Sequence, residues 1–138
     1  MDDKDIRIIE ILMENARVTK TNIAKELNIT EAAVRKRISN LESRRILLGY
    51  KAAVDYKAVG LSASLTGIDV EPENIWKVVM TLKNMEPIKA MWLTTGDHTL
   101  ICQVVARSIG ELSAAHERIA AVEGVKRICP AVILDTLK

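Results

Sequence analysis

The chain has 138 residues, of which 49% are hydrophobic and 28% charged, and its formal net charge is +2. It is long enough to form one domain or two small ones around a substantial apolar core. No apolar run approaches the roughly 20 residues that a membrane-spanning helix needs. The acidic start, MDDKDIRII, also lacks the pattern of a secretory signal peptide. We therefore expect a cytoplasmic protein with no membrane partner.

The cysteines and histidines argue against disulfide, metal and catalytic chemistry. Cys102 and Cys129 belong to no CxxC or Cys/His spacing, and His98 and His116 are isolated from each other. No Ser/His/Asp or Cys/His grouping suggests a nucleophile with its base. We expect two reduced thiols, no metal, no cofactor and no enzyme activity.

Residues 3–15 predict the first helix, which completes a three-helix unit with the two helices that follow. Asp2 or Asp3 is the expected N-cap, and acidic residues in the first turn favour a helix start. Helical spacing predicts a wide apolar stripe in which one row is flanked by further apolar residues. The predicted row is Ile6, Ile9 and Met13, with Ile8 and Leu12 beside it.

The stretch from Thr21 to Leu48 predicts two helices joined by a three-residue turn at residues 28–30. Thr19 or Thr21 can cap the first of these helices and Thr30 the second. Asn28 tolerates a left-handed backbone better than most residues, which suits a turn this tight. Helices so joined cross steeply and leave one side of the second helix exposed. The expected apolar centre consists of Ile23, Leu27, Ile29, Val34, Ile38 and Leu41.

The second of these helices carries a local excess of positive charge. From Val34 to Lys51, six basic residues face a single acidic one, Glu42. A solvated helix face would show the same charge, but the surrounding helix-turn-helix favours phosphate and base contacts in a DNA major groove. A rotation of about 100° per residue from an inward Val34 directs Lys36 outward. The predicted DNA-contacting residues are Thr30, Ala32, Ala33, Arg35, Lys36, Arg37, Ser39, Asn40 and Arg44.

The pattern changes after Leu48, where Gly49 ends the helical stretch. We divide the chain into a helix-turn-helix (winged-helix-like) domain over residues 1–48, a linker strand or hinge over 49–60, and a second domain over 61–138. The second domain shows strand patterns at 61–70, 88–95, 98–106 and 125–134, and helical patterns at 73–85 and 109–122.

This order is β-α-β-β-α-β, which predicts an α+β protein with a ferredoxin-like second domain, an antiparallel four-stranded sheet with two helices on one face. In the usual strand order, 4-1-3-2, Cys102 and Cys129 lie about two strand spacings apart, roughly 9–10 Å. That separation is too large for a disulfide. The residues expected to face inward from the last helix are Ile109, Leu112, Ala115 and Ile119.

Three segments together resemble the Lrp/AsnC family of transcriptional regulators: IAKELNITEAAVRKRISNLE, the exit LLGY and the hairpin TTGDHTL. The resemblance covers almost the whole chain. It implies a sequence-specific DNA-binding regulator that forms homodimers through its sheet and assembles them into tetramers or octamers. It also implies that the second domain binds an amino acid or similar small effector between dimers. Siroheme decarboxylases share this architecture, but the chain has no Arg/His cluster suited to tetrapyrrole carboxylates.

The turn at Gly96 and Asp97 has two interpretations, a plain hairpin turn or an effector loop. In the second interpretation, backbone groups hold the α-amino and carboxylate groups of an amino acid, and Asp97 pairs with its ammonium. The predicted effector-binding residues are Gly96, Asp97, His98 and Thr99, with Asp135 as a further candidate for side-chain selection. The alternative function is an oligomeric DNA-organising protein that needs no effector.

Overall fold

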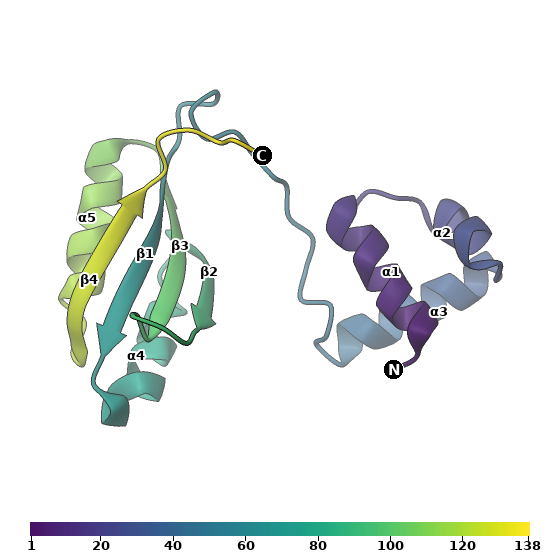
Figure 1. Ribbon diagram of the computed structural model, residues 1–138, viewed down its shortest axis with the longest axis horizontal. Coiled ribbons are helices and arrows are strands. Elements are labelled where there is room, and N and C mark those ends of the chain that lie inside the picture. The colour runs from purple at the N-terminus through teal and green to yellow at the C-terminus, as the bar shows by residue number, and fades with distance from the viewer. The chain divides into compact units, whose positions relative to one another are not determined.

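The computed structural model describes all 138 residues, which divide into two compact units, residues 1–53 and 54–138 (Figure 1). No helix in either unit is long and apolar enough to cross a membrane. Residues 49–55 form no regular secondary structure, so the linker strand suggested by the sequence is not formed.

The N-terminal unit consists of α1 (Asp3–Glu14), α2 (Lys20–Leu27) and α3 (Glu31–Ser43). Each helix begins at a predicted cap. The Asp2 carboxylate accepts from the backbone N–H of Asp5, and the Asp5 carboxylate accepts from the backbone N–H of Asp2, so the two form a capping box. The hydroxyls of Thr19 and Thr30 accept from backbone N–H groups 3.1 and 3.0 Å away. Such a cap stabilises a helix by about 1 kcal/mol. Residues 1–53 contain no strand, so this unit has no wing.

The apolar centre of this unit confirms the prediction for α2 and α3 and corrects it for α1. Ile23, Val34 and Leu41 are fully or almost fully buried, with Leu27 and Ile29 packed against them. On α1 the buried residues are Ile8, Ile11 and Leu12, whereas Ile6 and Met13 are 45% and 81% exposed. The predicted row was wrong because α1 has isoleucines on opposite sides, and the packing of α2 and α3 decides which side is buried.

The C-terminal unit has the predicted β-α-β-β-α-β order. Its elements are β1 (Ser62–Val70), a short 3-10 helix (Pro72–Asn74), α4 (Ile75–Leu82), β2 (Ile88–Leu93), β3 (Leu100–Ala106), α5 (Ile109–Ala120) and β4 (Val125–Val132). The four strands form one antiparallel sheet in the order β2-β3-β1-β4, and α4 and α5 lie against one of its faces (Figure 1). The predicted fold is confirmed.

The strand register also confirms the prediction about the cysteines. Cys102 on β3 pairs with Thr66 and Cys129 on β4 pairs with Gly67, so β1 separates the two thiols. Both are free, and burial raises the pKa of Cys102 to about 11, which keeps that thiol protonated. Ile109 was predicted to face inward but is 60% exposed, because it is the first residue of α5, directly after the cap Ser108.

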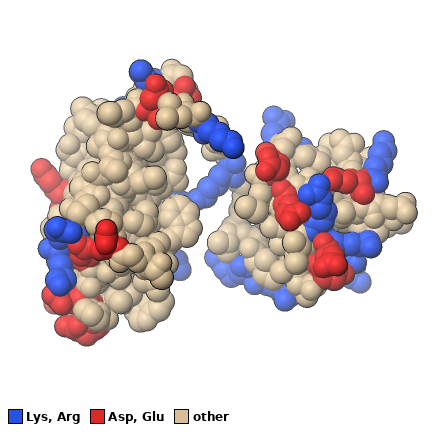
Figure 2. Space-filling view, viewed as in Figure 1, with Lys and Arg blue, Asp and Glu red and all other residues tan.

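Helices cover one face of the sheet and leave the other face uncovered. The face under the helices holds the core, whose fully buried members are Ile68, Val70, Leu100, Cys102, Val104, Val78, Leu82, Leu112, Ala115 and Ile119. The other face has no helix over it, and Leu65 and Trp92 on it remain 46% and 52% exposed. Figure 2 shows a broad area of uncharged side chains on this unit.

A small polar cluster lies within the helix-covered face. The hydroxyl of Ser64 is 2.8 Å from Nε2 of His116 on α5 and 2.9 Å from the hydroxyl of Thr66. Ser64 and Thr66 are completely buried, and their hydrogen bonds offset the cost of placing hydroxyls there. Burial lowers the pKa of His116, because desolvation disfavours the charged imidazolium.

This lowered pKa predicts an acid-sensitive C-terminal unit. The unfolded chain takes up the proton of His116 more readily than the folded one. The contribution of His116 to stability is therefore complete above its ordinary pKa of 6.5 and is lost as the pH falls below that value. Urea unfolding at about pH 7.5 and about pH 5.5 measures this effect. Wild-type protein should lose more stability on acidification than His116→Asn. An identical pH dependence in the two proteins would contradict the assignment.

Candidate functional site

The outward side of α3 presents short and basic side chains to solvent. Ala32, Lys36 and Ser39 are exposed, as the helical rotation predicts, and Ala33 is half-buried. Asn40 and Arg44 are exposed along one flank. The opposite side of the helix is anchored by Val34, Ile38 and Leu41 in the core. These predicted DNA contacts on α3 therefore share one accessible surface. Arg35, Thr30 and Arg37 make contacts within the chain and are described next.

Arg35 makes an ion pair of 2.9 Å with Glu31, one turn earlier on α3. The two side chains are 60% and 48% exposed, and an exposed pair of this spacing contributes only about 0.3–0.5 kcal/mol. Arg35 can therefore exchange Glu31 for a phosphate at little cost. Thr30 uses its hydroxyl to cap α3, which leaves its backbone at the positive end of the helix.

Arg37 is bound within the chain. Its guanidinium donates to the carboxylates of Asp2 and Asp5 at 2.8 and 3.0 Å, and its side chain is only 30% exposed. Arg37 holds the pKa of Asp2 down at about 2, with help from the Asp5 backbone N–H, and these carboxylates raise the pKa of Arg37. Among the predicted DNA contacts, Arg37 is thus the one that ties the start of α1 to α3.

In the C-terminal unit, the loop between β2 and β3 is tied to β1. The backbone N–H of Thr94 donates to the carbonyl of Thr99 at 3.0 Å, and the Thr94 hydroxyl donates to the carbonyl of His98 at 3.0 Å. The hydroxyl of Thr99 accepts from the Val70 backbone N–H at 3.3 Å. Gly96 has a φ of +97°, a conformation that a side chain would strain.

His98 connects this loop to two strands. Its Nδ1 lies 2.9 Å from the carboxylate of Asp69, and Nε of Arg127 donates to the other oxygen of that carboxylate at 3.0 Å. His98, and then Arg127, lower the pKa of Asp69 and keep it ionised. The imidazole lies where a Cβ on Gly67 would project, so the glycine makes room for the ring.

A cavity of about 500 Å³ lies beside the loop. It brings together Asp97 and Thr99, two of the predicted effector residues, with residues that the sequence pattern did not single out. The lining residues are Asp69, Val70, Asp97, Thr99, Lys126 and Arg127. The predicted strand order was the signal that could have found them, because it already places the end of β1 and the start of β4 next to the loop.

Asp135 does not join this group within one chain. It follows β4, whose last residue, Val132, pairs with Ser64 near the start of β1, whereas the loop lies beyond Val70 at the end of β1. The antiparallel register therefore puts Asp135 past the opposite end of the sheet. Within one chain, Asp135 therefore lies apart from Gly96–Thr99.

Comparison with known proteins accounts for both units. The AsnC-type helix-turn-helix domain matches residues 1–42, and the Lrp/AsnC ligand binding domain matches residues 64–138. The chain belongs to the Lrp/AsnC family. It is similar to the HTH-type transcriptional regulator LrpA of Pyrococcus horikoshii, with 39% identity over 140 residues covering 100% of this chain and 99% of that one.

Other relatives agree. The regulator LrpA1 of Halobacterium salinarum is 32% identical, and the match covers 96% of this chain and 94% of that protein. Among solved structures, the leucine response regulatory protein (LrpA) of Mycobacterium tuberculosis aligns with a TM-score of 0.77 and 28% identity, covering 100% of this chain and 95% of that one.

The family relationship establishes the general function. This Lrp/AsnC protein is a transcriptional regulator with a DNA-binding helix-turn-helix domain and a ligand-binding domain, and modulation by an effector is typical of its family. Its relatives are named as transcriptional regulators and not as enzymes, which confirms the prediction that it is not an enzyme.

Proposed function

We propose that this regulator reads DNA with the exposed side of α3 lying in a major groove. The main supporting observation is the division of α3 into two sides. Val34, Ile38 and Leu41 fix one side in the core, while Lys36 and Asn40 on the other side are exposed and make no side-chain hydrogen bond. A DNA reader works where the genome lies, so we also propose a cytoplasmic location.

The proposed contacts divide by chemistry. Lys36 and Arg35 reach guanine edges or phosphates, and Arg44 and the backbone at Thr30 reach phosphates. Ala32 and Ala33 let the helix approach closely, while Ser39 and Asn40 supply shorter hydrogen-bonding groups. Arg37 supports this surface by holding α1 against α3 through Asp2 and Asp5.

Replacing Lys36 with alanine should weaken specific binding about 5- to 150-fold, the equivalent of roughly 1–3 kcal/mol for one good base contact. Replacing Arg35 should act in the same direction. Removing a cation that binds a phosphate should also reduce the salt dependence of binding by about one unit of slope. Gel-shift titration against a selected genomic operator at several salt concentrations measures both quantities.

Lys83→Ala is the control, since it removes an exposed cation from the C-terminal unit, outside the helix-turn-helix. It should leave operator binding within about twofold, because Lys83 is not one of the proposed DNA contacts. Operator affinity that is unchanged in the Lys36 and Arg35 variants would contradict the assignment of α3.

We further propose that two copies act together through the uncovered face of the sheet. The basic excess around α3 is modest, so one copy would bind DNA weakly. Leu65 and Trp92 leave about half of two large apolar side chains in water, and half-buried Ile101 lies on the same face. Pairing of two such faces buries them and presents two recognition helices to half-sites about 10 bp apart. We also propose that such dimers assemble into tetramers or octamers.

Trp92→Glu should dissociate the assembly, because it places a charge in the proposed apolar interface. Trp76→Glu is the matched control, since Trp76 is 70% exposed but lies on α4, at the opposite face of the sheet. Sedimentation velocity should show a smaller species for Trp92→Glu only, with reduced operator affinity. A sedimentation coefficient equal to that of the wild type would rule out this interface.

We propose the cavity beside the β2–β3 loop as the effector site. Its lining supports a zwitterion, because it holds carboxylates at Asp69 and Asp97 and cations at Lys126 and Arg127. In this proposal the backbone groups of Gly96, His98 and Thr99 bind an α-carboxylate, and Asp97 pairs with an α-ammonium. An effector acts on DNA binding only if it binds two assembly states with different affinity.

Titration calorimetry of the whole protein against the twenty amino acids tests this site. At least one amino acid should bind. Asp97→Asn should lower the affinity for that amino acid tenfold or more, because the variant cannot form the ion pair with its α-ammonium. Asp135→Asn is the control and should leave binding unchanged, because Asp135 lies past the other end of the sheet. Silent titrations, with operator binding unaffected by every amino acid, would favour the effector-independent DNA-organising protein.

A further inference from the structure

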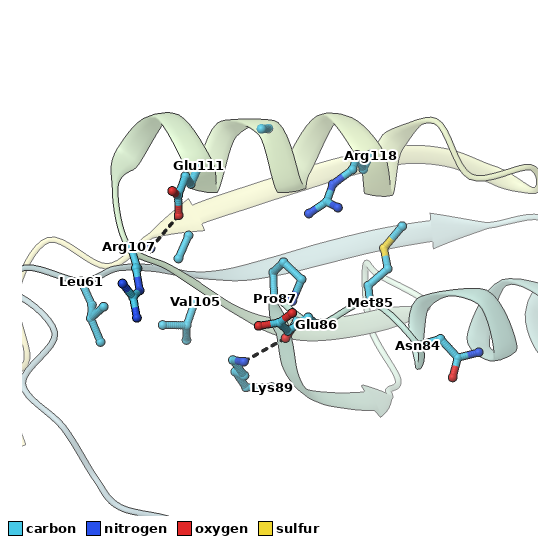
Figure 3. Close-up of a pocket in the computed structure, with 12 residues that line it drawn as sticks. Leu61, Asn84, Met85, Glu86, Pro87, Lys89, Val105, Arg107, Glu111 and Arg118 are labelled. Carbon is cyan, nitrogen blue, oxygen red and sulfur yellow. Dashed lines mark hydrogen bonds between the residues drawn. The ribbon is translucent and has the colours of Figure 1, made fainter.

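The C-terminal unit contains a second and larger cavity, of about 650 Å³, at the end of the sheet away from the β2–β3 loop. It lies between α5 and the segment that joins α4 to β2 (Figure 3). It shares no residue with the cavity beside the loop. The lining residues are Leu61, Asn84, Met85, Glu86, Pro87, Lys89, Val105, Ala106, Arg107, Glu111, Ala114 and Arg118.

One wall of this cavity is formed by one face of α5 together with Arg107, which lies just before the helix. Arg107, Glu111, Ala114 and Arg118 follow each other at spacings of four, three and four residues, which places them on one side of the helix. Figure 3 shows the guanidinium of Arg118 directed from α5 toward Met85 and Pro87, and that of Arg107 directed toward Leu61 and Val105.

The two guanidiniums are without partners. Neither Arg107 nor Arg118 makes a side-chain hydrogen bond or ion pair. Glu111, which could neutralise Arg107, instead accepts from its backbone N–H at 3.3 Å. The Lys89 ammonium donates to the carbonyl of Glu86 at 2.9 Å. With three cations against the carboxylates of Glu86 and Glu111, the lining carries a net charge of +1.

The wall opposite α5 is apolar. Leu61, Met85, Pro87 and Val105 are half-buried and line the same cavity as the two guanidiniums. An unpaired guanidinium beside such a surface attracts an anion more strongly than one surrounded by water, and its planar fork matches a carboxylate or phosphate. The volume falls in the range of about 300–1,000 Å³ that is usual for small-molecule sites.

We propose that this cavity binds a small organic anion, with its oxyanion head on Arg107 and Arg118 and a short aliphatic body against Leu61, Met85 and Val105. The site does not depend on the effector proposal, because the two cavities lie at opposite ends of the sheet and have no residue in common. The regulator then has room for two ligands at once.

Three probes separate the parts of the ligand. The first, 4-methylpentanoate, has a carboxylate head and a branched aliphatic body. The second, 4-methylpentan-1-amine, has the same body and the opposite charge, and the third, inorganic phosphate, has an anionic head and no body. NMR titration of the whole, isotope-labelled protein should show saturable binding of 4-methylpentanoate with a dissociation constant of about 1 mM, which is an affinity that a ligand of this size can reach. Its binding should shift the NMR signals of Leu61, Met85 and Val105. Phosphate should bind at least several-fold more weakly, and the amine should not bind.

Arg107→Gln and Arg118→Gln should each weaken 4-methylpentanoate binding about tenfold, the effect of removing one charge-assisted hydrogen-bonding group. Both residues are exposed, so thermal unfolding should remain as in the wild type. Lys83→Gln, which removes an exposed cation of the same unit outside the lining, should leave binding unchanged. Absence of binding, equal binding of the amine or of phosphate, unchanged affinity in both arginine variants, or shifts confined to residues 94–99 would each overturn the proposal.

Discussion

The three-residue turn between α2 and α3 is the constraint on which the DNA-reading unit depends. Asn28 ends α2 with φ 54° and ψ 47°, a left-handed conformation, and its backbone N–H still reaches back to the last carbonyls of α2. Two residues later, Thr30 caps α3. A chain that turns this sharply has no freedom to lay the helices side by side, so Ile23 and Val34 meet in the core and the far side of α3 remains in solvent.

An equally strict constraint organises the C-terminal unit. Antiparallel pairing in the order β2-β3-β1-β4 collects the end of β1, the start of β3 and the start of β4 at one end of the sheet. Asp69, His98 and Arg127 meet there although they are far apart in sequence. The opposite end receives the segment before β1, the start of β2 and the approach to α5, which form the second cavity. Topology alone thus separates the two candidate ligand sites.

Features set by local chemistry were predictable from the sequence, and features set by tertiary packing were not. Capping by Asp2, Thr19 and Thr30 involves residues three apart, so the sequence contains all of the information. The buried side of α1 could not be deduced in the same way, because its isoleucines satisfy helical spacing on two sides. The ion pair of Arg37 with Asp2 spans 35 residues and depends on how α1 and α3 pack. The sequence pattern also indicated the β2–β3 loop, whereas Lys126 and Arg127 beside it follow only from the strand order, which pairs the start of β4 with the end of β1.

The position of His98 suggests how events at the β2–β3 loop can reach the rest of the sheet. Its ring lies against Gly67 on the uncovered face, and its Nδ1 contacts Asp69 on the same strand, which Arg127 of β4 also binds. A ligand that competes for Asp69 or Arg127 must therefore alter the contacts of a ring on the same face of the sheet as the proposed interface between copies. The ring fills the space that a side chain at residue 67 would take, so a shift of the ring changes the surface offered to a partner. Differential contacts of this kind are what any coupling between effector and assembly requires.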